Sequence, residues 1–452
     1  MLTDVVGQST RDAQIPAVST GRLLNCYREP VQDGDKTKYA LLAVPGMTNR
    51  YTLNGVFMRA METVRGAIYA VCGGNFYEVT DTATTLLGAV ADSPNTTISG
   101  HDGYVTVAAG GNYYVWNGST LTTPAAGAIT SIGSVSQEGS YTLLTELDGK
   151  RWEWSSLADA TNLPGTNFAS AEQRDDNLLR VFPVTGLVWL FGTASIEIWT
   201  RTGLPGAAAF EFLTGGVYDI GLKAFGLVTR FDGGVFFVGD DGIVYISSGT
   251  GMQPVSTPAV ASAIEAGAAS RCISYEARGH KFCGIIFDDR PAWFYDISTG
   301  EWHERSEGVD HAPWAVVASA QIGQAWYVGR NNGVIASLER TASDGNNPLV
   351  REFVSRTLYR DGQRFKIVAF EMYARHGLDV PPSGALAATI QFSPDNGLTW
   401  GKQRSVNLGG LGQYGLRAIL RALGQFRQAT VKIRMSDPVY APVYASANLV
   451  IA

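Results

Sequence analysis

The chain has 452 residues and a mass of 48.4 kDa, with 45% hydrophobic and only 17% charged residues. Glycine makes up 52 of the 452 residues, or 11.5%, against about 7% in average proteins, whereas proline is ordinary at 18. This composition excludes disorder, coiled coil and collagen, and it favours many short strands joined by tight turns.

The charges are unevenly distributed along the chain. Residues 1–350 carry 22 basic and 35 acidic side chains, a net charge of −13, whereas residues 351–452 carry 13 basic and 6 acidic ones, a net charge of +7. Such a break predicts a domain boundary or a partner-facing surface near residue 350. The low overall charge suits a subunit that buries much of its surface in an assembly.

Signals for export, membranes and catalysis are missing from the sequence. The first 16 residues are polar and predict no signal peptide, and the apolar runs are too short for a membrane-spanning helix. The four cysteines form no CxxC pair, so we expect free, buried thiols in a reducing cytosol, with disulfides as the alternative. The five histidines have no metal-binding spacing, and no GxSxG or phosphate loop occurs. We therefore expect no enzyme activity, no cofactor, no metal and no membrane partner.

The chain is expected to begin with an N-terminal arm, residues 1–40, and then to alternate between apolar runs and turns. Asp-Gly occurs seven times and Asn-Gly four times, and these dipeptides accept the positive φ angles of tight hairpin turns. Between residues 66 and 340 we identify seven hairpin-like units, which begin near residues 66, 102, 139, 184, 231, 279 and 323.

The hairpin units recur every 36 to 48 residues, a period typical of the blades of a β-propeller. In six of them the returning strand carries an aromatic residue, in order Tyr77, Trp116, Trp154, Trp199, Tyr245 and Tyr295. Alternation of these aromatics with small or polar residues is expected when one face packs on the next blade. The sequence therefore predicts an all-β fold with a propeller of six to seven blades at residues 41–345; a β-sandwich of similar hairpins is the alternative.

Two segments have helical character. Residues 257–270 predict a short helix with threonine or proline at its start, and residues 415–424 predict one or two turns ending at Gly424. Residues 341–350 are polar and rich in Gly, Asn and Pro, so they are the expected linker. Strand patterns after it predict a separate, sandwich-like β-domain at residues 346–452.

One local motif in this C-terminal domain fits an Asp-box hairpin, S-x-D-x-G-x-T-W. Its residues are Ser393, Asp395, Gly397, Thr399 and Trp400. In such a hairpin the aspartate accepts backbone N–H bonds, the glycine permits the turn and the tryptophan packs beneath it. Asp-boxes occur in sialidase propellers, but this single copy lies outside the predicted blades and is expected to be a folding device.

Basic side chains gather near the C-terminus and are candidates for docking a partner. They are Arg417, Arg421, Arg427, Lys432 and Arg434. On the predicted helix, Arg417 and Arg421 would share a face and could meet carboxylates of a neighbouring subunit. An acidic protein partner, a solvated face and DNA all remain open as explanations.

Several stretches resemble the packaged-DNA stabilisation, or tail hub, proteins of short-tailed phages. The family opens with F-P-G-[IM]-T-x-R-Y, N-G-V and V-x-G-G-x-[LF]-Y, and the main matching residues here are Pro45, Gly46, Arg50, Tyr51, Cys72, Gly73, Gly74 and Tyr77. A second matching stretch has Phe191, Gly192, Ser195, Ile196 and Glu197, and the end of the chain is similar as well.

The resemblance implies a non-enzymatic virion protein. It would form a six-fold ring that closes the DNA exit channel below the portal and the head-to-tail adaptor, and stabilises the packaged DNA. Tail fibres, spikes or a needle would attach to it, and DNA would pass through the lumen at genome ejection without sequence-specific binding. The ring would belong to the virion tail and assemble in the bacterial host cytoplasm.

Two other functions stay open at this point. The first is a carbohydrate-binding or glycosidase-type propeller acting in host-surface recognition, which needs a cluster of arginines and a Tyr/Glu pair at the propeller centre. The second is a free-standing binding propeller, which predicts a stable monomer.

Overall fold

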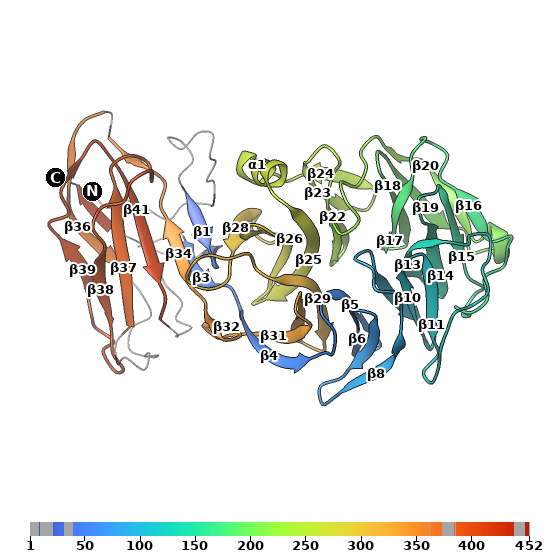
Figure 1. The fold of residues 1–452 in the computed structure, drawn as a ribbon. Coiled ribbons are helices and arrows are strands. Elements are labelled where there is room, and N and C mark those ends of the chain that lie inside the picture. Colours follow the sequence, from blue (N-terminus) through green and yellow to red (C-terminus); the bar gives the residue numbers. More distant parts are fainter. Residues whose placement is uncertain are drawn as a thin grey trace.

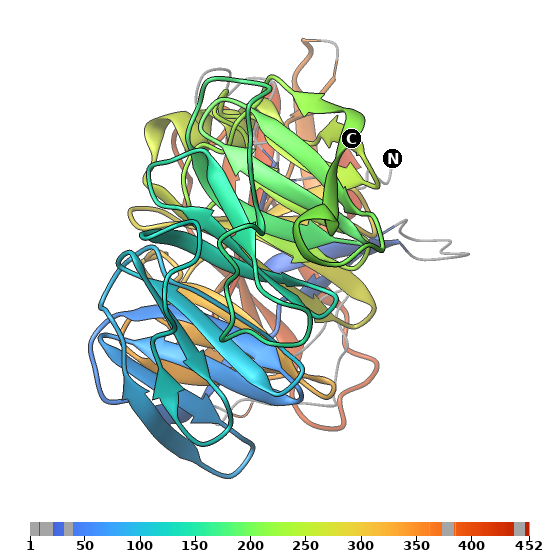
Figure 2. The same cartoon turned by 90° about the vertical axis from the view of Figure 1, so that its right-hand side faces the viewer.

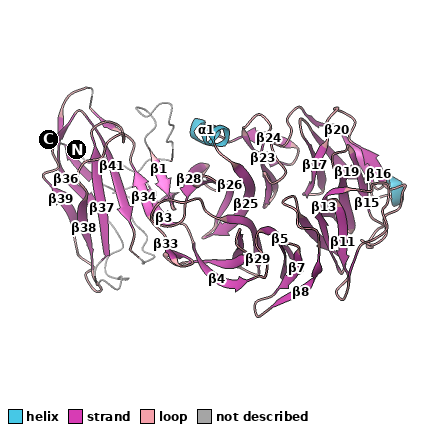
Figure 3. Ribbon diagram, in the orientation of Figure 1, coloured by secondary structure: helices cyan, strands magenta, loops and turns pink. Residues whose placement is uncertain are grey.

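The protein, described here from a computed structural model, consists of a propeller and a sandwich. The structure describes residue 9 and residues 21–30, 39–360, 362–372, 384, 386–437 and 448–451. In Figure 1 the sandwich lies at the left and the propeller at the right, with β1 (Arg22–Leu24) and β34 (Arg351–Val354) between them. Seen from the propeller side, the blue and green blades stand in front of the orange and red sandwich strands (Figure 2). Almost all of the described elements are strands (Figure 3).

The first four blades are independent four-stranded antiparallel sheets. Blade 1 contains β5 (Met58–Val64), β6 (Ala67–Cys72), β7 (Asn75–Val79) and β8 (Thr84–Ala89). Blade 2 contains β9 (Thr97–His101), β10 (Tyr104–Ala109), β11 (Asn112–Trp116) and β12 (Leu121–Thr122). Blade 3 contains β13 (Ile132–Glu138), β14 (Tyr141–Glu146), β15 (Arg151–Trp154) and β16 (Phe168–Ser170). Blade 4 contains β17 (Leu178–Val184), β18 (Leu187–Gly192), β19 (Ile196–Arg201) and β20 (Phe210–Tyr218), with a 3-10 turn at Gly206–Ala208.

The last three blades continue the ring, and the final one is completed by a strand from the start of the chain. Blade 5 contains β21 (Val228–Phe231), β22 (Gly234–Val238), β23 (Val244–Ser248) and β24 (Gly251–Pro254). Blade 6 contains β25 (Ala269–Ala277), β26 (His280–Phe287), β27 (Ala292–Asp296) and β28 (Glu301–Arg305). Blade 7 contains β29 (Val316–Ile322), β30 (Ala325–Arg330), β31 (Val334–Glu339) and, as its outermost strand, β4 (Gly46–Thr52). The described residues therefore form seven blades, closed between β31 and β4.

The predicted turns and aromatic positions explain this arrangement. Asp102 and Gly103 join β9 to β10 with φ angles of 44° and 99°, as expected for an Asp-Gly hairpin. The six predicted aromatics all fall on the third strand of their blade. Separate clusters of buried apolar side chains fill the spaces between neighbouring blades, such as blades 1 and 2 or blades 3 and 4. Burial between blades, rather than within one, is what holds the ring together.

One helical prediction is confirmed and the other is wrong. Helix α1 (Pro258–Ala266) begins after Thr257, whose side chain accepts a hydrogen bond from the Val260 amide. Residues 415–424 instead contain the strand β39 (Ala418–Arg421), which pairs with β36 (Phe365–Met372). This segment thus finds backbone partners in another strand over Ala418–Arg421, whereas an isolated helix of one or two turns is marginal.

The sandwich consists of two sheets that share a single apolar core. One sheet continues blade 6 through β1 and β34 into β41 (Gln428–Met435), β37 (Leu386–Ser393) and β38 (Arg404–Gly409), with β35 (Leu358–Tyr359) also paired to β41. The other contains β36, β39, β40 (Gln425–Phe426) and β42 (Asn448–Ile451). Strand β41 alternates buried and half-buried residues, because one face packs on the core.

The remaining strands lie beside the junction of propeller and sandwich. They are β2 (Cys26–Pro30) paired with β3 (Tyr39–Ala43), and β32 (Ser343–Asp344) paired with β33 (Asn347–Pro348). The predicted linker thus forms a hairpin that joins the sheet of β4. Most of the predicted N-terminal arm lies outside the described residues, and the bounds of the three predicted segments, 1–40, 41–345 and 346–452, stay predictions. In the described part of the chain no helix is long and apolar enough to cross a membrane.

Candidate functional site

Pro45 and Gly46 lie at the closure of the propeller, where β4 meets β31 and β32. The Pro45 carbonyl accepts a hydrogen bond of 2.7 Å from Arg305 Nη2. Arg305 also lies 3.4 Å from Asp344 Oδ1, and both side chains are fully buried. Burial raises the pKa of Asp344 to about 6, against the pull of Arg305. The start of β4 is therefore fastened to blade 6 and to β32 through one buried ion pair.

Gly46 allows β4 to approach β32 closely. A Cβ atom at Gly46 would overlap the backbone carbonyl oxygens of Ser343 and Thr341, which cannot rotate away. We expect Gly46→Ala to lower the free energy of unfolding by about 1–3 kcal/mol, the usual cost of overpacking. Urea unfolding measures this loss. Gly165→Ala is the matched control, because nothing lies near its Cβ position; equal stabilities of the two variants would contradict the close approach.

Arg50 and Tyr51 lie further along β4. Arg50 donates from Nε to Ser337 Oγ at 2.8 Å and forms an ion pair with Glu339, both residues of β31. Tyr51 is half-buried opposite Ile335 and packs on the apolar cluster between blades 7 and 1. Both residues therefore hold the strand that closes the ring.

Cys72, Gly73, Gly74 and Tyr77 surround the loop that leads from β4 into blade 1. Cys72 Sγ lies 3.4 Å from the Gly55 carbonyl, and Tyr77 donates from its hydroxyl to the Asn54 carbonyl at 2.8 Å. The Gly73 amide donates to the Phe57 carbonyl at 2.9 Å, and the Gly74 carbonyl accepts from the Val90 amide at 2.9 Å.

The structure thus brings all eight residues of this predicted motif to the closure of the ring, although their function stays a prediction. All four cysteines are free and buried, as predicted.

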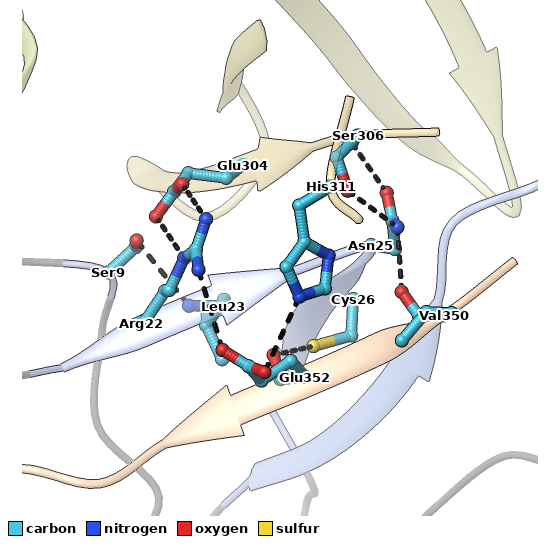
Figure 4. A network of polar contacts seen from close by, with 10 residues as sticks. All are labelled: Ser9, Arg22, Leu23, Asn25, Cys26, Glu304, Ser306, His311, Val350 and Glu352. Atoms are coloured by element: carbon cyan, nitrogen blue, oxygen red, sulfur yellow. Dashed lines mark hydrogen bonds and ion pairs between the residues drawn. The ribbon is translucent and has the colours of Figure 1, made fainter. Parts of the chain in front are cut away.

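A polar network joins the propeller to the sandwich (Figure 4). Arg22 of β1 contacts Glu304 of blade 6 through Nη2 at 2.7 Å and Nε at 3.0 Å, and it contacts Glu352 of β34 at 3.4 Å. Asn25 accepts from the Ser306 amide at 3.0 Å and donates to the Val350 carbonyl at 2.7 Å. Each of these two residues of the N-terminal segment bridges one blade and the start of the sandwich.

The charged groups around Glu352 shift the pKa of its carboxyl group strongly. Burial raises its pKa, but the hydrogen bond from His311 and the charges of Arg22 and Lys432 outweigh burial and lower the pKa to about 2. Sequence reasoning missed Arg22, Glu304 and Glu352, because these residues lie 282 and 330 positions apart and carry no local motif.

The depressed pKa of Glu352 predicts a loss of stability in acid. Its ordinary pKa is 4.5, so the ionised group stabilises the fold above pH 4.5, and this contribution disappears as the pH falls towards 2. The full contribution is on the order of 3 kcal/mol. Urea unfolding of the wild type and of Glu352→Gln between pH 7 and pH 3 measures it: the difference between the two proteins should shrink with falling pH. A difference independent of pH would contradict the assignment.

The Asp-box residues form the predicted hairpin between β37 and β38. Asp395 Oδ1 accepts from the Thr399 amide at 2.8 Å and from Ser393 Oγ at 2.7 Å. The hydrogen bonds from Thr399, then from Ser393, lower the pKa of Asp395 to about 2. Gly397 has φ of 87°, and Trp400 lies beneath it. The side-chain hydrogen bonds of Ser393, Asp395 and Thr399 lie within this hairpin, as expected of a folding device.

Three of the five basic candidates have partners within the chain, and docking of a partner stays a prediction. Arg417 forms a bidentate pair with Glu371 of β36. Lys432 Nζ lies 4.0 Å from the centre of the Trp400 ring, and Arg434 donates to the Val309 carbonyl at 2.7 Å. Arg421 and Arg427 are exposed, so these two residues remain candidates for docking a partner.

In the described part of the chain, no cluster of His, Cys, Asp and Glu side chains is suited to hold a metal ion. The contacts described above fasten the ring and attach the sandwich to it.

Comparisons with known proteins agree with this architecture. A family model described as "Bacteriophage P22 Gp10, beta-propeller" matches residues 22–343, and one described as "Bacteriophage P22 Gp10, beta-sandwich" matches residues 350–448. The tail hub protein gp10 of Salmonella phage P22 is 30% identical over 190 residues, which cover 37% of this chain and 38% of that protein.

Two solved structures match parts of this chain at low similarity. PorZ of Porphyromonas gingivalis, a surface component of a type-IX secretion system, has a TM-score of 0.41 and 12% identity over 72% of this chain and 45% of its own. A chain of a mitotic checkpoint complex has a TM-score of 0.43 and 10% identity over 69% of this chain and 97% of its own. At these TM-scores neither structure bears on the function.

Proposed function

The chain belongs to the bacteriophage P22 Gp10 family, and from this premise we propose that it is a structural tail hub protein of a phage virion. The observation that carries the proposal is the match of both family models, in order, to the propeller and to the sandwich. The predicted fold, a propeller of six to seven blades with a C-terminal sandwich, is confirmed by the same matches and by the observed sheets.

In the finer proposal, six copies form a ring below the portal and the adaptor. The ring closes the DNA exit channel, stabilises the packaged genome and carries fibres, spikes or a needle. The continuous sheet from blade 6 through β1 into the sandwich supports this, because it makes each subunit a single stiff block. The net charge of −13 over residues 1–350 would keep DNA from adhering to a lumen that this part lines.

Exposed apolar side chains of the sandwich supply candidate contacts between subunits or with a partner. Leu398, Leu411 and Tyr414 are 72%, 70% and 67% exposed. Together with Arg421 and Arg427, they fit a partner that offers apolar side chains and carboxylates.

Particles that lack the protein test this proposal. A phage with a nonsense codon in this gene, grown in a host that does not suppress it, should yield heads that package DNA but lose it to nuclease and carry no fibres or spikes. Supplying the wild-type protein should restore both. Particles that keep their DNA and their fibres without this protein would contradict the proposal.

The alternative, a carbohydrate-binding or glycosidase-type propeller, requires arginines and a Tyr/Glu pair at the propeller centre. The cavity there is lined by four arginines and by Glu62, but by no tyrosine among the described residues. The glycosidase version therefore stays a prediction, and the tyrosine that it requires is not among the described lining residues.

A further inference from the structure

A cavity of about 300 Å³ lies at the centre of the propeller, where the inner strands of all seven blades converge. Its charged lining residues are Arg59, Glu62, Arg180, Arg230 and Arg271. Arg59 is paired with Asp92 at 2.6 Å, so the other three arginines dominate the charge of the cavity. A positive centre is unexpected in a propeller whose part of the chain has a net charge of −13.

The three arginines come from three consecutive blades. Arg180 lies on β17, Arg230 on β21 and Arg271 on β25. In β17 and β25 the pairing register shifts by one residue immediately before the arginine, so a β-bulge redirects the side chains that follow. Burial, and then the charges of Arg271 and Arg230, lower the pKa of Arg180 to about 9. The charges of Arg271 and Arg230 thus act unfavourably on the charged form of Arg180.

Uncharged groups of the protein hold these arginines in place. Arg180 donates to the Phe225 carbonyl at 3.2 Å and lies 4.8 Å from the centre of the Phe225 ring. Arg271 donates to the Pro94 carbonyl at 2.5 Å, and Arg230 lies 5.3 Å from the centre of the Phe182 ring.

Within the described residues, none of the three forms an ion pair, and the buried Nε of Arg180 has no hydrogen-bond partner. The charges of Asp288 and Glu62 act favourably on Arg271 and Arg180, but neither carboxylate is directly paired with them. Like charges without a directly paired counter-charge are costly in a partly desolvated space.

Glu62 defines the other side of the cavity. It lies on β5 of blade 1, which is across the seven-membered ring from blades 4 and 5. Burial raises the pKa of Glu62, and the charges of Arg230 and Arg180 offset part of this rise. The glutamate therefore interacts electrostatically with both arginines. A cavity of about 300 Å³ has room for a small molecule but excludes a DNA duplex or a folded peptide.

We propose that this cavity binds a small oxyanion, a carboxylate or phosphate group, between the guanidinium groups of Arg180, Arg230 and Arg271. Guanidinium groups match the oxygens of both anions through paired, charge-assisted hydrogen bonds. Binding would supply a directly paired counter-charge and give the free Nε of Arg180 a partner. Hydroxyl groups at the other end of such a ligand would reach towards Glu62. This inference is independent of the tail hub role.

Calorimetric titration of the full-length protein tests the proposal. The probes are inorganic phosphate and glucuronate at constant ionic strength, with glucose as the uncharged reference. We expect at least one of the two anions to bind and glucose not to bind. Tighter binding of glucuronate would identify a carboxylate ligand, and tighter binding of phosphate would identify a phosphate ligand; either result supports the oxyanion site.

Variants then locate the bound anion. Arg230→Gln should weaken binding about ten- to hundredfold, the effect of losing one charged hydrogen-bonding partner, whereas Arg201→Gln, an exposed arginine outside the cavity, should not. Arg180→Met should raise the melting temperature of the ligand-free protein and abolish the anion's stabilising effect. Failure of both anions to bind, or equal binding by Arg230→Gln and Arg201→Gln, would overturn the proposal.

Discussion

Arg305→Met is expected to lower the free energy of unfolding by about 3–5 kcal/mol, because it leaves a buried carboxylate without its counter-charge. Arg305 and Asp344 are both fully buried. The variant also loses the hydrogen bond to the Pro45 carbonyl and the contact with the Trp314 ring, whose centre lies 3.7 Å from the guanidinium carbon. Urea unfolding at pH 7 measures the loss.

The pH dependence of this loss is a second readout of the same ion pair. The pKa of Asp344 is raised from 3.8 to about 6. Protonated Asp344 therefore stabilises the fold fully below pH 3.8, and this contribution is lost as the pH rises through 6. At pH 5 a protonated Asp344 needs no counter-charge, and the cost of Arg305→Met should be smaller there. The double variant Arg305→Met with Asp344→Leu should recover most of the stability. A single-variant loss under about 1 kcal/mol would contradict the role of this pair in closure.

Arg22→Met is expected to lower the free energy of unfolding by a similar amount, about 3–5 kcal/mol, and to separate the unfolding of the two domains. Arg22 is the shared partner of Glu304 and Glu352, whose side chains are only 8% and 6% exposed. Without it, the buried carboxylates on the two strands that flank β1 lose their shared counter-charge, and β1 loses its ion pairs to both strands.

Scanning calorimetry distinguishes the outcomes for Arg22→Met. The wild type should unfold in one main transition, whereas the variant should show two, with the sandwich melting apart from the propeller. The control is Arg174→Met, which removes an exposed pair with Asp219 and should change nothing measurable. A single transition at the wild-type temperature would show that Arg22 does not couple the domains.

Local sequence patterns were sufficient to predict the blades. Asp-Gly and Asn-Gly turns fix where a strand reverses, and aromatic residues such as Trp116 and Trp154 mark the strand that packs on the next blade. The Asp-box and helix α1 were also predictable, because their hydrogen bonds join residues only two to four positions apart.

Contacts between distant parts of the chain were not predictable. Strand β4 pairs with β31, which lies almost 300 residues later, and the local pattern of neither strand indicates which strand it pairs with. The misplaced helix at residues 415–424 has the same origin, because the edge of β36 that recruits β39 is about 50 residues away. The four arginines of the central cavity lie on four different blades, so only closure of the ring brings them together.

Electron microscopy of the purified protein, alone and with its adaptor, tests the central claim most directly. The tail hub role predicts closed rings of six copies, in which each copy shows a seven-bladed propeller joined to its sandwich. Preparations that contain only monomers, or open filaments, under both conditions would contradict it.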